Sequence, residues 1–137
     1  MKRFALAGFV LCLLISPGCR SANSQKDYDI TPDNLTSADL PPAKFMVIEF
    51  ESKDNTPITA MLVKTEDATK AMDALKTSES SKKEMSVEQA VGTVKPLAQQ
   101  TGPKGTLTPP TTDSKTAYSV LMFAKKKTTV TVKTKGK

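Results

Sequence analysis

Two pairs of short apolar segments on either side of a helical region constrain the fold of this chain more than any other feature. Residues 45–51 and 58–63 form the first pair, and residues 117–124 and 128–133 form the second. Their β-branched and aromatic side chains are typical of strands, and polar turn residues separate the members of each pair. We therefore predict that the first two strands are antiparallel neighbours and that 128–133, where Val alternates with Thr and Lys, is a partly exposed edge strand.

Helices are predicted between the two pairs of strands. Apolar residues repeat over 68–75 with the spacing of one helical face, and Thr65 stands at the expected N-cap. A second helix should begin at Ser86, which forms a capping-box sequence with Gln89, and should end near Pro96. The expected fold class is α+β: a small two-layer sandwich with a mostly antiparallel sheet of about four strands and one or two helices on one face.

The N-terminal segment has the layout of a secretory signal. Lys2 and Arg3 precede an uncharged run of 12 residues from Phe4 to Ile15. This run is shorter than the roughly 20 residues that a helix needs to cross a bilayer. A cleaved export signal over residues 1–18 is therefore favoured over an uncleaved transmembrane anchor.

Residues 15–19, Ile-Ser-Pro-Gly-Cys, follow the apolar run and place small residues before Cys19. This pattern resembles the lipobox of bacterial lipoproteins, and the resemblance is confined to the signal and Cys19. It implies that Cys19 is lipidated and becomes the N-terminus of a membrane-anchored product. Because Arg20 and not Asp follows, it also implies the outer membrane or the periplasmic face in a Gram-negative cell. Ordinary signal cleavage, which gives a soluble secreted or periplasmic protein, remains an alternative.

The rest of the chain is expected to divide into three parts. Residues 19–43 are polar, acidic and rich in Pro, and they predict a disordered tether. Residues 44–134 predict a single domain, because a chain of this length does not bury two separate cores. Residues 135–137 are expected to form a short basic tail.

The composition argues against most catalytic chemistry. The chain has no histidine, and its two cysteines, Cys12 and Cys19, lie in the signal and at the cleavage site. Histidine-based metal sites and nucleophilic triads are therefore excluded, and no cofactor is expected. Glu49 and Glu51 share one face of a predicted strand, but carboxylates in that position are usually only solvated. We predict that the protein is not an enzyme.

The lysines of the C-terminal region are the remaining candidates for binding. No acidic residue occurs after residue 113. Clustered ammonium groups attract anionic polymers and headgroups. A solvated turn is the favoured interpretation of the contiguous lysines, since no aromatic side chain lies among them. The weaker alternative is an anion-binding surface made of Lys125, Lys126, Lys127, Lys133 and Lys135.

These observations predict an exported, lipid-anchored protein of the cell envelope with a non-catalytic binding or structural domain. Its expected partners are the membrane, through the N-terminal lipid, and an unidentified protein or envelope polymer. The alternative is a soluble secreted or periplasmic domain that binds an anionic polymer or a membrane surface through a basic C-terminal hairpin. Nucleic acid is not an expected partner, because an exported protein rarely meets it.

Overall fold

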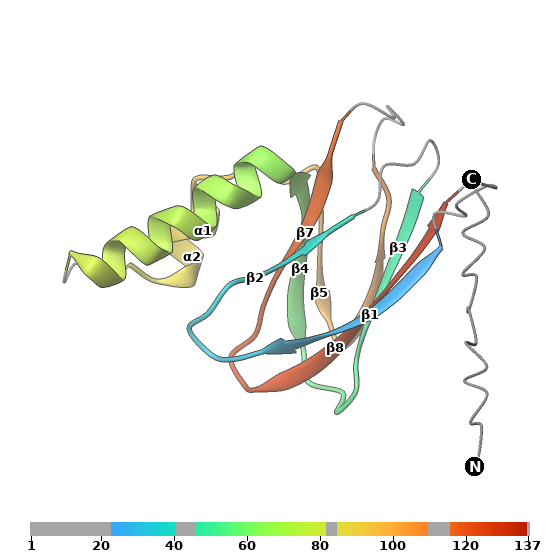
Figure 1. Ribbon diagram of the computed structural model, residues 1–137. Helices are drawn as coiled ribbons and strands as arrows, with labels where there is room; N and C mark the ends of the chain where they lie inside the picture. Colours follow the sequence, from blue (N-terminus) through green and yellow to red (C-terminus); the bar gives the residue numbers. More distant parts are fainter. Residues whose placement is uncertain (1–22, 41–45, 82–84, 110–115, 137) are drawn as a thin grey trace, which may run out of the picture.

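The computed structural model describes residues 23–40, 46–81, 85–109 and 116–136 (Figure 1). Its strands form two antiparallel sheets of four strands each. The first sheet contains, in spatial order, β1 (Ser24–Ile30), β8 (Thr128–Gly136), β3 (Met46–Ser52) and β6 (Lys104–Leu107). The second sheet contains β2 (Thr36–Asp39), β7 (Tyr118–Phe123), β4 (Ile58–Lys64) and β5 (Ala98–Gly102). Two helices, α1 (Thr65–Ser80) and α2 (Val87–Gly92), follow β4, and the predicted α+β sandwich with antiparallel pairing is confirmed.

Four connections cross from one sheet to the other: β1 to β2, β3 to β4, β5 to β6 and β7 to β8. The two strands that each of these connections joins therefore lie in different sheets. The prediction that the first two apolar segments are antiparallel neighbours is therefore wrong. Both edges of β3 are occupied by β8 and β6, and both edges of β4 by β7 and β5. Crossing between sheets lets both strands direct an apolar face into the same interior.

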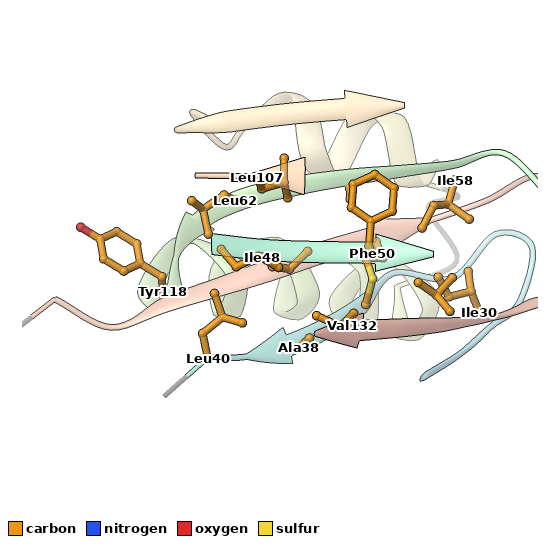
Figure 2. Packing of buried hydrophobic residues seen from close by; sticks show 14 of the residues in the cluster. Ile30, Ala38, Leu40, Ile48, Phe50, Ile58, Leu62, Leu107, Tyr118 and Val132 are labelled. Carbon is orange, nitrogen blue, oxygen red and sulfur yellow. The ribbon is translucent and has the colours of Figure 1, made fainter. Parts of the chain in front are cut away.

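The main core lies between the two sheets. Figure 2 shows Phe50 and Ile48 of β3 facing the interior, and one apolar cluster there also includes Ile30 and Val132 of the first sheet and Leu62 of the second. These side chains are almost completely buried. The alternation along β8 follows from this arrangement, because its valines point inward and its lysines point to solvent. β8 lies between β1 and β3, so the expectation that it is an edge strand is wrong.

The two helices cover the other face of the second sheet (Figure 1). Ala68 and Ala71 of α1 pack there in a second apolar cluster with Val63 of β4. The predicted capping box of α2 is present: the backbone N–H of Gln89 donates to Ser86 Oγ at 3.2 Å. Thr65 is not an N-cap, because Lys64 occupies that position and the hydroxyl of Thr65 is bonded to Ser119.

Two strands lie inside the segment that the sequence predicts as a tether. β1 pairs with β8 along its whole length, from Ser24 opposite Thr134 to Ile30 opposite Thr128. β2 pairs with β7, and Ala38 is buried in the core. The prediction of disorder over 19–43 is therefore wrong for the part of it that the structure describes. The expected basic tail is also shortened, because β8 continues to Gly136.

Gly105 of β6 is a point where the backbone lies very close to the core. A Cβ atom at this position would lie 2.6 Å from Cζ of the buried Phe50 ring. We expect Gly105→Ala to lower the free energy of unfolding by about 1–3 kcal/mol through overpacking. Urea denaturation measures this change. Gly92→Ala is the control, because its added Cβ would contact nothing within 4 Å apart from adjacent residues and the backbone of its own helix. Equal unfolding midpoints for the two variants would contradict the prediction.

Candidate functional site

Three of the connections between sheets gather at one end of the sandwich. They comprise residues 31–35 between β1 and β2, 53–57 between β3 and β4, and 124–127 between β7 and β8. Figure 1 shows these connections at the lower end of the molecule, opposite the start of β1 and the end of β8. We call this region the loop end. Loops held by a rigid sheet are frequent binding sites, so its surface is the first candidate for function.

The loop end surrounds a hollow of about 950 Å³. Its apolar lining includes Val87 at the start of α2 and the half-buried Phe123 at the end of β7. Its charged lining residues are Asp33, Asp54, Glu88, Lys125 and Lys126. A hollow lined by apolar side chains and by charges of both signs suits a protein segment better than a uniformly charged polymer.

Two of the three loops have backbone conformations that restrict their shape. Asp33 has a φ of 61° and Asn55 a φ of 60°, in the left-handed region where Asp and Asn are enriched among residues other than glycine. The side chain of Asn34 accepts a hydrogen bond from the backbone N–H of Leu35 at 2.8 Å. Leu35 itself is buried under α1 in the second apolar cluster. The conformation of the 31–35 loop is therefore restricted by the Asn34 hydrogen bond and by the burial of Leu35.

Asp54 links the 53–57 loop to the beginning of β8 through hydrogen bonds. Its carboxylate accepts hydrogen bonds from the hydroxyls of Thr128 and Ser52 and from the backbone N–H of Thr56. The two hydroxyl groups also lie within 3.0 Å of each other, and both residues are buried. The Thr128 hydroxyl, followed by that of Ser52, holds the pKa of Asp54 far below its usual range. Asp54 therefore stays ionised at neutral pH and serves the loop as an acceptor, not as a proton donor.

Replacing Asp54 should make the free energy of unfolding less dependent on pH in the acid range. The carboxylate of the folded chain has a lower pKa than that of the unfolded chain, so its contribution is complete above the ordinary Asp pKa of about 4 and declines as the pH falls below it. We expect Asp54→Asn to be less stable than the parent at pH 7, with a difference that shrinks below about pH 4. Thermal unfolding of both chains across this range measures the effect. A difference that does not vary with pH would contradict it.

The predicted anion-binding lysines fall into two separate groups. Lys125, Lys126 and Lys127 are exposed in the 124–127 loop, and the ion pairs found among the described residues do not include them. Lys133 and Lys135 lie on the outer face of the first sheet, where Lys135 Nζ is 3.0 Å from Glu49 Oε1. β7 and β8 belong to different sheets, so the expected basic hairpin is a connection between sheets. Cys19 lies outside the described residues.

The outer face of the first sheet carries charges of both signs. Glu49 and Glu51 share this face, as predicted, and line a hollow of about 470 Å³ with Lys104 and Lys133. In the described part of the chain, no group of three or more His, Cys, Asp or Glu side chains could hold a metal ion. This face therefore carries mixed charge that is largely exposed to solvent.

Sequence reasoning identified the lysines of the loop end but not their apolar neighbours. Phe123 belongs to the predicted strand over 117–124; it packs against the second apolar cluster and also borders the hollow, where it is half-buried. Val87 lies in the helix predicted to begin at Ser86, but the sequence does not show that this helix borders the loop end. The Asp-Asn-Thr-Pro sequence at 54–57 indicated a turn, but nothing in it indicated that residues 31–35 lie beside it.

Comparison with known proteins shows a similarity of fold. No family model and no curated protein match the chain. The fold is similar to the crystal structure of Aeromonas hydrophila PliG, a periplasmic lysozyme inhibitor of g-type lysozyme, with a TM-score of 0.50 and 5% sequence identity. The alignment covers 85% of this chain and 87% of PliG. Among the described residues, no helix has the length and apolar character needed to span a membrane.

Proposed function

We propose that this chain is an exported, lipid-anchored protein of the cell envelope that binds a protein partner through its loop end and catalyses no reaction. The observation that carries the proposal is the loop end itself, where two loops of restricted conformation border a partly apolar hollow beside exposed lysines. Restrained loops lose little conformational freedom on binding, which favours affinity. The half-buried Phe123 supplies the kind of aromatic anchor that is enriched at protein interfaces.

A lysozyme, and first a g-type lysozyme, is the proposed partner. The support is the shared fold with PliG, whose described role is inhibition of that enzyme. The charge of the 124–127 loop adds to this support. Glycoside hydrolases usually act with paired carboxylates, and a lysine-bearing loop has the opposite charge. Binding over a substrate cleft would inhibit the hydrolase without any chemistry on the part of this chain.

The test measures binding and inhibition together. The purified protein is titrated against a g-type lysozyme, with binding followed by calorimetry and activity followed by lysis of bacterial cell walls. We expect saturable binding and a loss of lysis with the same concentration dependence. Absence of binding to g-type lysozyme would overturn the assigned partner. Retention on an immobilised anionic polymer, without lysozyme binding, would favour the polymer-binding alternative.

The proposed anchor is tested at Cys19. A bacterium that produces the protein is supplied with a labelled fatty-acid analogue, and the chain is then purified. We expect the parent chain to carry the label, and Cys19→Ala to lack it and to accumulate as an unprocessed precursor. Normal processing of the Cys19→Ala chain would contradict lipidation and would leave ordinary secretion.

A further inference from the structure

The part of the chain that the structure describes begins only a few residues after Cys19, the proposed lipid anchor. Asn23 is held to the fold, because its side-chain oxygen accepts a hydrogen bond from the backbone N–H of Gly136 at 3.2 Å. Cys19 precedes Asn23 by four positions. Four residues span at most about 14 Å even when fully extended. An acylated Cys19 would therefore keep the start of β1 close to the bilayer surface, without the long spacer that a tether over 19–43 implies.

The start of β1 lies at the opposite end of the sandwich from the loop end. Ser24 is paired with Thr134 near the end of β8, whereas Ile30 is paired with Thr128 beside the 124–127 loop. Figure 1 shows the end of β8 and the start of β1 together, away from the loops. A strand of the length of β8 extends for about 30 Å. The start of β1 and the loop end are therefore separated by the length of the first sheet.

The surface next to Asn23 has a composition that suits lipid headgroups. We call it the anchor corner, and its exposed residues are Gln25, Lys26, Val47, Lys133 and Lys135. Val47 is 37% exposed and lies opposite Lys135 on the outer face of the first sheet. The acidic groups on the same face are Glu49, which lies opposite Lys133 and is ion-paired with Lys135, and Glu51 farther along β3. Lysines around an exposed aliphatic side chain attract anionic headgroups while the aliphatic group enters the interface.

The second-sheet side of the same end is less suited to this contact. It carries Lys64 at the end of β4, but also Asp39 at the end of β2 and Glu66 and Asp67 in the first turn of α1. Within the ends of β2 and β4 and the first turn of α1, these three carboxylates outnumber the one lysine, Lys64. Contact with an anionic bilayer is therefore expected at the anchor corner of the first sheet.

From these observations we propose that the anchor corner rests on the anionic headgroups of the anchoring bilayer, so that the loop end faces away from the membrane. This inference rests on the lipid anchor of the proposed function. It adds an orientation: the partner-binding surface stands about one sheet length above the bilayer, accessible to a protein that approaches from the aqueous side.

The test places a fluorophore at each end of the anchored protein. The full chain is produced with its own signal, recovered from membranes, and reconstituted into phosphatidylglycerol-containing vesicles that also hold a nitroxide-headgroup lipid as quencher. In the lipidated product, a cysteine introduced as Gln25→Cys or Lys126→Cys carries the free thiol. We expect quenching at position 25 to be several-fold stronger than at position 126. Equal quenching, or stronger quenching at position 126, would overturn the orientation.

A second pair of variants tests the lysines. Lys133→Gln with Lys135→Gln should reduce quenching at position 25, and replacing phosphatidylglycerol by a neutral lipid should have the same effect. Lys125→Gln with Lys126→Gln, at the loop end, should leave it unchanged. Unchanged quenching in the first variant would exclude the headgroup contact. A soluble product with a free Cys19 thiol would overturn the anchor and the orientation together, whereas a lipidated chain with reversed quenching would overturn the orientation alone.

Discussion

Truncation of one side chain in β1, Ile30→Ala, is expected to lower the free energy of unfolding by about 2–5 kcal/mol. Ile30 is fully buried and belongs to the core between the two sheets. Removing its outer carbons leaves a cavity that neighbouring strands cannot close without breaking their pairing. Domains of this size have a total stability of about 5–15 kcal/mol, so the loss is a large part of the whole. Urea denaturation of the purified chain measures it directly.

Gln25→Ala is the matched control, because Gln25 is on the same strand and is exposed. Its expected effect is within about 0.5 kcal/mol, as for most surface substitutions. The two variants distinguish the strand seen in the structure from the disordered tether that the sequence predicts. A tether would make both substitutions neutral. An Ile30→Ala chain with parental stability would therefore contradict the assignment of β1 to the folded domain.

The elements that the sequence identified correctly are those with a strong apolar period. β3, β4 and β7 are rich in large apolar side chains because both of their neighbours and the opposing layer cover them. α1 was identified from its apolar stripe and α2 from its capping box. In these segments local preference and tertiary environment agree, which makes the pattern sufficient.

The missed strands are those at the edges of the sheets. β1, β2, β5 and β6 each occupy an edge position. Their polar side chains face solvent, as in β5, where Gln99, Gln100 and Thr101 are all exposed. They are held by backbone pairing with a stronger neighbour, such as β4 for β5, and by single buried side chains, such as Ile30 of β1 and Leu107 of β6. A segment of this kind has no apolar period of its own and reads as a loop until its partner is known.

The division of strands between sheets could not be predicted from local sequence either. The connection between β3 and β4 is long enough for a hairpin and equally long enough to cross between layers. The outcome depends on which strands occupy the edges of β3, and those are distant in the sequence. For the same reason Lys133 and Lys135 lie far from the 124–127 loop, because β8 extends along the first sheet toward Asn23.

Charge reversal in the 124–127 loop should have the largest effect on the proposed binding of a lysozyme. With Lys125, Lys126 and Lys127 all replaced by Glu, we expect affinity for a g-type lysozyme to fall by about two orders of magnitude or more. Like charges brought together at an interface cost several kcal/mol, and each 1.4 kcal/mol corresponds to about tenfold in affinity. The fold should be retained, because all three side chains are exposed. Calorimetric titration of the variant and the parent gives the ratio.

The matched control reverses three exposed lysines elsewhere, Lys26, Lys64 and Lys95, and so changes the net charge by the same amount. These positions lie away from the loop end, and the hollow there does not include them. We expect this variant to bind within a few-fold of the parent, with its remaining deficit removed by added salt because distant exposed charges are screened. Equal losses in the two variants would show that binding follows overall charge, and would contradict a specific contact at the loop end.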